Sequence, residues 1–150
     1  MLKEGDQAPE IQVQSDTGDL FDLQSLRGKK VVLYFYPRAS TPGCTVEAGE
    51  FRDAINKFEK KGAAVIGVSP DSPKAQTGFK DKECLPFTLL CDLDKKIANA
   101  YGVWQEKNMY GKKVMGIART TFVIDEGGKI QKIFAKVKPA GHAEEVLEAL

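Results

Sequence analysis

The sequence has little of what several specialised protein classes need. Its longest uninterrupted apolar run is Val31–Tyr36, far short of the roughly 20 residues of a membrane-spanning helix. The 22 lysines and arginines are balanced by 21 acidic residues, giving a net charge of +1. That balance argues against binding nucleic acid or an anionic membrane by bulk charge. The charged start, MLKEGDQAPE, lacks the apolar stretch of a signal peptide.

Histidine and cysteine are also scarce. The chain has one histidine and three cysteines, and no two cysteines lie two or three residues apart. We therefore expect no multi-ligand zinc or iron–sulfur site, and no metal or bound cofactor. An odd number of cysteines without a signal peptide predicts a cytoplasmic protein without a structural disulfide framework. A length of 150 residues predicts a single domain over 1–150.

Strand and helix patterns alternate along the chain. Val31–Tyr36 and Ala63–Val68 are continuously apolar or nearly so, which is typical of strands buried on both faces. Between them, apolar residues recur at helical spacing and predict one amphipathic helix. Those residues are Ala48, Phe51, Ile55 and Phe58. A strand, a helix and a strand form a βαβ unit with parallel strands. The sequence thus predicts an α/β fold with a central mixed β-sheet flanked by helices.

Shorter patterns complete this fold. Turn residues and apolar spacing predict an N-terminal β-hairpin, further short strands and helices, and a helix at the carboxyl end. The hairpin pairs Ile11–Val13 with Phe21–Leu23; a helix starts near Ser72; a strand covers Phe87–Leu90; a helix covers Asp94–Tyr101; strands cover Thr121–Ile124 and Ile130–Phe134; and the last helix covers Ala143–Leu150.

Cys44 stands where a reactive thiol is favoured. Pro37 ends the first buried strand, and Pro42 suits the first turn of the following helix. Cys44 is therefore expected within that first turn, at the carboxyl edge of the sheet, where open α/β sheets bind ligands. The free N–H groups and dipole of a helix N-terminus favour thiolate over thiol. Cys44 also extends the apolar stripe of the helix backwards, so its sulfur should point into a pocket.

The other cysteines and the histidine have simpler interpretations. Cys91 ends an apolar run and is expected to be a small buried hydrophobic residue. Cys84 has the same interpretation, with a reactive role as its alternative. His142 lies near the start of the last helix, far in sequence from Cys44, and is expected to be structural or on the surface.

The segment around Cys44 resembles a known family. Pro37, Thr41 and Cys44 match the peroxiredoxin signature Pro-x-x-x-Thr-x-x-Cys. The fuller pattern, YFYP followed by TPGCT-x-E, is similar to the bacterioferritin comigratory protein subfamily, also called peroxiredoxin Q. Three later stretches agree with it, so the resemblance covers nearly the whole chain. They are Gly67–Ser72, Leu85–Asp92 and Glu106–Asp125.

The resemblance implies a thioredoxin-like fold and a cytoplasmic thiol peroxidase, acting on hydrogen peroxide or organic hydroperoxides. Cys44 would be the peroxidatic cysteine that becomes a sulfenic acid, and Thr41 would hydrogen-bond the sulfur and the peroxide. Pro37 would shield the pocket, Arg119 would be the active-site arginine, and Glu47 would hold an arginine in place. The resemblance also implies thioredoxin as the reductant, no cofactor, and a monomer rather than a dimer.

The resemblance leaves open how the sulfenic acid is resolved. Many relatives have a resolving cysteine five residues after the peroxidatic one, where this chain has Gly49. Others have it on the next helix, at the position of Lys80, and Cys84 lies one helical turn further on. Cys84 is therefore the first candidate, an external thiol is the second, and Cys91 or an intermolecular disulfide follows.

Three other functions fit less well. A cysteine phosphatase needs an arginine six residues after the cysteine, where this chain has Glu50. A thioredoxin-type reductase needs a second cysteine at position 47, which is Glu47. A redox-sensing or chaperone-like binding module would have a reactive cysteine without steady turnover, and the residues alone leave that alternative open.

Overall fold

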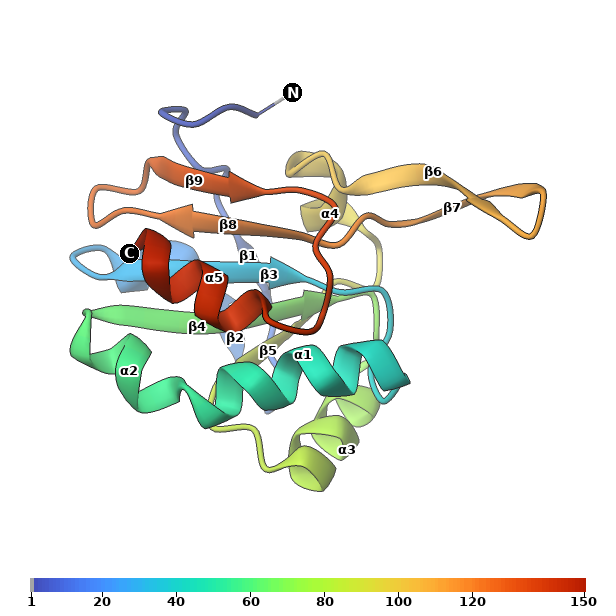
Figure 1. The fold of residues 1–150 in the computed structure, drawn as a ribbon, viewed down its shortest axis with the longest axis horizontal. Coiled ribbons are helices and arrows are strands. Elements are labelled where there is room, and N and C mark those ends of the chain that lie inside the picture. Colours follow the sequence, from blue (N-terminus) through green and yellow to red (C-terminus); the bar gives the residue numbers. More distant parts are fainter. Residues whose placement is uncertain (1) are drawn as a thin grey trace.

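A five-stranded mixed sheet forms the centre of the molecule (Figure 1). The computed structural model describes residues 2–150. The strand order is β5-β4-β3-β8-β9. Three strands are mutually parallel: β3 (Lys30–Phe35), β4 (Ala63–Ser69) and β5 (Thr88–Cys91). β8 (Thr120–Ile124) runs antiparallel to β3, and β9 (Ile130–Phe134) runs antiparallel to β8. The predicted mixed sheet is confirmed.

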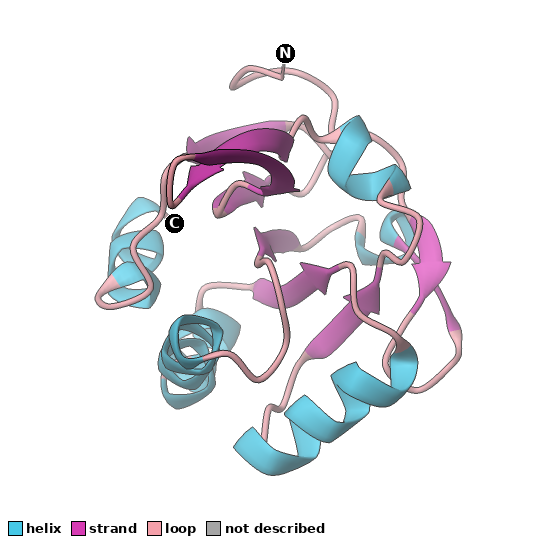
Figure 2. Cartoon of the chain, turned by 90° about the vertical axis from the view of Figure 1, so that its right-hand side faces the viewer, coloured by secondary structure: helices cyan, strands magenta, loops and turns pink. Residues whose placement is uncertain are grey.

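Helices cover one face of this sheet. They are α1 (Pro42–Asp53), α2 (Ile55–Lys60), α3 (Pro73–Glu83) and α5 (His142–Ala149). Their apolar side chains share one cluster with alternate residues of β3, including Val32 and Tyr34. Figure 2 shows these helices on one side of the strands.

The opposite face is covered by smaller elements. The predicted N-terminal hairpin is present as β1 (Gln12–Gln14) and β2 (Leu20–Asp22). It is followed by the 3-10 helix η1 (Leu23–Leu26), and α4 (Lys96–Ala100) packs nearby. The other residues of β3, Val31, Leu33 and Phe35, point into this second cluster. β3 is buried on both faces because each face has its own apolar layer. Within residues 2–150, no helix combines the length and hydropathy needed to cross a membrane.

The predicted helix after β3 is wrong in one respect, because it is interrupted at Ala54. The backbone there has φ −100° and ψ 5°, and the chain continues as the separate helix α2. The Phe51 and Phe58 rings remain in contact across the bend, with centroids 5.6 Å apart. The apolar stripe is therefore kept although the helix is not continuous.

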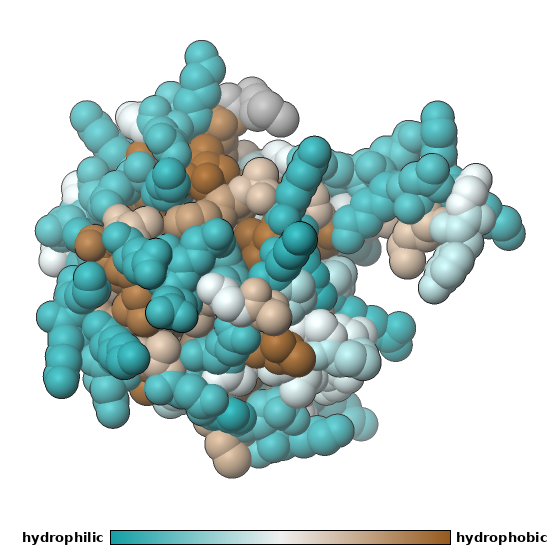
Figure 3. Space-filling model, in the orientation of Figure 1, coloured by the Kyte–Doolittle hydropathy of each residue, from teal (hydrophilic) through white to brown (hydrophobic). Residues whose placement is uncertain are grey.

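A two-stranded arm projects from the body of the molecule, and the hydrophobic pattern did not predict it. It consists of β6 (Trp104–Met109) and β7 (Lys112–Ile117). Figure 3 shows it extending as a mostly hydrophilic projection. Tyr110 and Gly111 connect the strands with φ 53° and 79°, which is the geometry of a two-residue hairpin turn. Most of its residues are exposed, so it lacks the apolar alternation that identifies a half-buried strand.

Tyr34 and Tyr36 allow a paired test of what a hydrogen bond from a buried hydroxyl contributes to stability. The buried Tyr36 hydroxyl donates to Gln76 Oε1 at 2.6 Å, whereas the buried Tyr34 hydroxyl has no hydrogen-bond partner within residues 2–150. Tyr36→Phe should lower the free energy of unfolding by about 1–3 kcal/mol, because it leaves the side-chain oxygen of Gln76 without its hydrogen-bond donor. Tyr34→Phe should leave it unchanged or raise it. Urea denaturation of both variants measures the difference, and equal losses would contradict this account.

Candidate active site

Cys44 lies in the first turn of α1, as predicted. β3 ends at Phe35, and Thr41 is the N-cap residue of α1 with φ −83° and ψ 156°. This position is at the carboxyl end of β3 and of its parallel neighbour β4. Cys44 is only 1% exposed, so its sulfur points into the protein. A helix N-terminus supplies N–H groups and a positive dipole end next to this sulfur.

Arg119 hydrogen-bonds both this sulfur and a carboxylate. It precedes β8, and its Nη2 donates to Cys44 Sγ at 3.2 Å. Its Nη1 donates to Glu47 Oε1 at 3.0 Å. Glu47 lies one turn after Cys44 on α1, so both acceptors face the same guanidinium. The structure therefore brings together three residues that the sequence analysis singled out.

Glu47 is almost completely buried, and its environment affects its charge. Burial raises the pKa of Glu47 to about 7, while Arg119 acts in the opposite direction. The carboxylate is 1% exposed and the arginine side chain 18% exposed. The contact of Glu47 with Nη1 lies on the same guanidinium that reaches the sulfur, and the role that the resemblance gives Glu47 stays a prediction.

Thr41 makes a different hydrogen bond from the one expected. Its hydroxyl donates to the carbonyl oxygen of Arg38 at 2.9 Å rather than to the Cys44 sulfur. A hydroxyl has one proton to donate, although its oxygen can still accept. The expected role of Thr41 toward a peroxide stays a prediction. Pro37 is half-buried in the same connection, and Ala39 N–H donates to Asp71 Oδ2 at 2.7 Å. This bond holds the loop between β3 and α1.

Gly43 and Pro139 belong to the site, and the sequence analysis did not single them out. A Cβ on Gly43 would lie 3.0 Å from Arg119 Nη2 and 3.5 Å from Pro139 Cγ. A larger residue before Cys44 would displace the guanidinium from the sulfur. In the sequence, the one sign of this close approach is the glycine itself, between Pro42 and Cys44.

The other two cysteines have different environments. Cys91 is buried at the end of β5, and burial raises its pKa to about 11, in agreement with a packing role. Cys84 is exposed, so the interpretation of this residue as a buried hydrophobic side chain is wrong. It follows α3 as the C-cap residue with φ 54°. A helix end at the surface places the side chain in solvent.

His142 is part of the core rather than the site. Its ring is buried between Phe51 and Phe134. Its Nε2 hydrogen-bonds Thr121 Oγ1 at 2.7 Å, and its Nδ1 hydrogen-bonds Glu145 Oε1 at 2.9 Å. The described part of the chain contains no group of three or more His, Cys, Asp or Glu residues arranged to hold a metal ion.

Comparisons with known proteins show the family of this chain. Residues 4–133 match the model of the AhpC/TSA family. A putative Bcp peroxiredoxin of Coxiella burnetii is 49% identical over 99% of both chains. Peroxiredoxin Bcp of Bacillus subtilis is 46% identical over 97% of this chain and 93% of its own. The structure of the Xanthomonas campestris bacterioferritin comigratory protein superposes with a TM-score of 0.88 at 41% identity, over 93% of this chain and 88% of that one. The chain belongs to the AhpC/TSA family and, within it, to the bacterioferritin comigratory proteins, or peroxiredoxin Q.

Proposed function

We propose that this protein is a thiol-dependent peroxidase that reduces hydrogen peroxide and organic hydroperoxides through a sulfenic acid at Cys44. The observation that carries the proposal is the Arg119 guanidinium, 3.2 Å from a buried sulfur in the first turn of a helix. The X. campestris relative was described for its alkyl peroxide reduction activity, which supports hydroperoxides as substrates. We further propose that residues 1–150 act as one thioredoxin-like domain.

The reaction is a displacement at oxygen. The Cys44 thiolate attacks the terminal peroxide oxygen, so an S–O bond forms while the O–O bond breaks. The electron pair of the O–O bond leaves with the other oxygen, which takes up a proton to become an alcohol or water. The sulfur is oxidised to a sulfenic acid and the peroxide is reduced.

Supplying thiolate is not enough to explain fast turnover. A free cysteine with a pKa of about 8.5 is about 3% ionised at pH 7, and lowering its pKa to about 6 would give roughly 90%, a gain of about thirty-fold. Nucleophilicity falls with pKa by roughly 10- to 18-fold over that range, which leaves a net gain of about two- to three-fold. The larger acceleration must therefore come from donors that meet the charge on the departing oxygen. We propose Arg119 and the first-turn N–H groups as these donors.

Replacing the sulfur tests the proposed function. Cys44→Ser should abolish consumption of hydrogen peroxide and of an organic hydroperoxide in the presence of thioredoxin, its reductase and NADPH. Cys91→Ser, which removes a buried thiol outside the site, is the matched control and should retain activity. Hydroperoxide turnover that survives in Cys44→Ser would overturn the proposal. A single stoichiometric reaction without turnover in the unsubstituted protein would instead indicate a redox sensor.

Arg119→Ala tests how the site accelerates the reaction. At a pH where Cys44 is already ionised, it should lower the single-turnover oxidation rate by far more than about thirty-fold, because donation to the departing oxygen is lost. Arg119→Lys keeps the charge but not the two-pronged geometry and should restore only part of the rate. Stopped-flow fluorescence or competition for peroxide would measure both. A loss of only a few-fold in Arg119→Ala would limit the arginine to stabilising the thiolate.

We also propose Cys84 as the thiol that resolves the sulfenic acid. It is exposed to solvent, and its helix α3 packs beside α1. The preceding residue, Glu83, accepts a hydrogen bond from Arg52 Nη1 at 2.7 Å through its carbonyl oxygen. Arg52 lies eight residues after Cys44, which corresponds to about 12 Å along the helix. A disulfide needs Cα atoms closer than about 7 Å, so helix ends must move before the bond forms.

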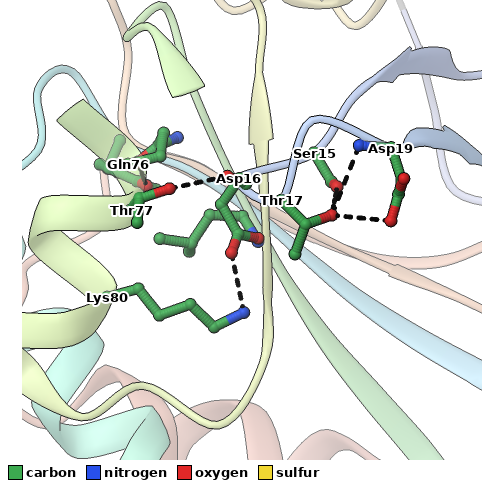
Figure 4. Close-up of polar contacts among 9 residues, drawn as sticks. Ser15, Asp16, Thr17, Asp19, Gln76, Thr77 and Lys80 are labelled. Carbon is green, nitrogen blue, oxygen red and sulfur yellow. Dashed lines mark hydrogen bonds and ion pairs between the residues drawn. The ribbon is translucent and has the colours of Figure 1, made fainter. Parts of the chain in front are cut away.

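Hydrogen bonds anchor the middle of α3, so the part of the helix that can move lies beyond them. Figure 4 shows Asp16 facing Thr77 and Lys80 of this helix. The Asp16 carbonyl accepts from Thr77 Oγ1 at 2.7 Å, and its carboxylate accepts from Lys80 Nζ at 3.0 Å. Cys84 lies beyond these anchors in a left-handed conformation, which costs a non-glycine residue roughly 1–2 kcal/mol. Within α3, movement is therefore easiest in the last turn.

A thioredoxin-type protein is the proposed reductant of the Cys44–Cys84 disulfide. Its attacking thiol would approach at the exposed Cys84, because the Cys44 sulfur is buried. The three free thiols suit the reducing cytoplasm, where we place the protein as a monomer.

Peptide mapping after one equivalent of peroxide tests the resolving step. A Cys44–Cys84 crosslink is expected in the unsubstituted protein and in Cys91→Ser, and it should be absent in Cys84→Ser. In Cys84→Ser, Cys44 should instead accumulate as a sulfenic acid that dimedone traps. Persistent sulfenic acid at Cys44 beside a free Cys84 in the unsubstituted protein would exclude this route and favour an external thiol.

A further inference from the structure

Residues 37–41 form the loop that leads from β3 to the first turn of α1, where Cys44 lies. The sulfur stands only three residues beyond this loop, so the conformation of the loop determines where the sulfur is held. Ser40, in the middle of it, has φ 64°. A residue other than glycine adopts this left-handed conformation at a cost in free energy, and it persists where the surrounding structure imposes it. The loop therefore needs a contact that holds it.

One hydrogen bond supplies this contact. The Ala39 N–H donates to Asp71 Oδ2 at 2.7 Å. Within residues 2–150, it is the only hydrogen bond between the loop and any segment outside the loop and α1. Asp71 lies two residues after β4, at the same edge of the sheet as Cys44, because β3 and β4 are parallel. A carboxylate acceptor makes such a bond charge-assisted and roughly twice as strong as one between neutral groups.

Asp71 is itself held by a chain of buried side chains. Ser69 Oγ donates to the same Oδ2 atom at 2.6 Å, and Gln76 Nε2 donates to Ser69 Oγ at 2.8 Å. Gln76 Nε2 also donates to the Leu90 carbonyl at 2.9 Å, and Gln76 Oε1 accepts from the Tyr36 hydroxyl at 2.6 Å. Ser69, Gln76 and Tyr36 are buried, so these bonds do not compete with water.

The bonds of this chain can run in one direction only. A backbone carbonyl accepts and cannot donate, so the amide nitrogen of Gln76 must face Leu90 and its oxygen must face Tyr36. Ser69 then receives a proton from Gln76 and donates its own to Asp71. A carboxylate, which has no proton to donate, completes the chain with every donor used. Side chains from β3, β4 and α3 thus fix the acceptor of the loop.

We propose that Asp71 is a positioning residue for Cys44, which holds the loop in the conformation in which the sulfur meets Arg119. Its effect on turnover rests on the proposed function. Cys44 must leave this position before the Cys84 thiol can attack its sulfenic sulfur. An S–S bond then forms, the S–O bond breaks, and the hydroxyl leaves as water with the thiol proton. Asp71 therefore supports the oxidation step and slows the resolving step, because the Ala39 bond has to open between them.

Hydrogen exchange in the reduced protein tests the contact without any peroxide. Mass spectrometry follows the backbone amides of residues 39–48. Asp71→Ala should speed their exchange by roughly ten-fold, as expected from the loss of a hydrogen bond to a charged group. Asp71→Asn keeps an acceptor oxygen without the charge and should have a smaller effect. Asp125→Ala is the matched control and should leave exchange unchanged, because Asp125 accepts from Gly127 and Lys129 N–H at the opposite end of the sheet (Figure 1).

The rates of the two chemical steps, measured with one equivalent of hydrogen peroxide, test the effect on turnover. In Asp71→Ala, the Cys44–Cys84 disulfide should form several-fold faster once the sulfenic acid is present, whereas Cys44 oxidation should be slower or unchanged. Asp125→Ala should alter neither rate. A general loss of stability would not move the two steps in different directions, so this pattern separates positioning from a merely structural role.

Unchanged exchange at residues 39–48 in Asp71→Ala, or an equal increase in Asp125→Ala, would overturn the proposal. A disulfide that forms no faster although the loop exchanges faster would overturn the effect on the resolving step. Circular dichroism and thermal melting verify that each variant is folded, and Asp71→Asn replaces Asp71→Ala if the latter does not fold. Faster loop exchange in a protein that peroxide does not oxidise would keep the positioning role of Asp71 while rejecting the peroxidase function.

Discussion

The site depends on the two hydrogen bonds that the Arg119 guanidinium donates, one to Cys44 and one to Glu47. One nitrogen donates to the Cys44 sulfur and another to the Glu47 carboxylate. A planar guanidinium held by one carboxylate has its remaining N–H groups aimed in fixed directions. Glu47 therefore orients the donor that meets the sulfur, and Arg119 in turn makes the burial of that carboxylate tolerable. The Val137 N–H donates to the Arg119 carbonyl at 3.1 Å, which also fixes the backbone that presents the arginine.

Local features of the sequence were sufficient to place Cys44 but not its partners. Pro37 and Pro42 mark a strand end and a helix start, and these are properties of neighbouring residues. Arg119 is 75 positions away, and no periodicity or spacing connects it with Cys44, so only the family resemblance indicated it. Cys84 was misplaced because it was given the general interpretation of an intracellular cysteine, a small buried hydrophobic residue, whereas the helix before it ends at the surface.

Gly49 lies beside the arginine that connects α1 with the end of α3. The resemblance places a cysteine there in many relatives. Here a Cβ on Gly49 would lie 3.4 Å from Arg52 Nη2, so the guanidinium occupies the space above the glycine. From there Arg52 reaches the carbonyl of Glu83, next to Cys84. The residue that stands in place of one resolving cysteine thus lies beside the arginine that links α1 to the end of the helix that carries another.

The chemistry of the site also weakens the interaction that holds Cys44 in place. A thiolate attracts the Arg119 guanidinium as an ion of opposite charge, whereas a neutral sulfenic acid carries no charge of its own, so the contact between this residue and Arg119 weakens on oxidation. After oxidation, Glu47 is the remaining anion facing the guanidinium, and the contact between Arg119 and the first turn of α1 is weaker. The first turn of α1 is therefore held more firmly while Cys44 is a thiolate than after its oxidation. On the proposed route, this weakening comes when Cys44 has to move toward Cys84, so the arginine proposed to support the oxidation step would also favour the start of the resolving step.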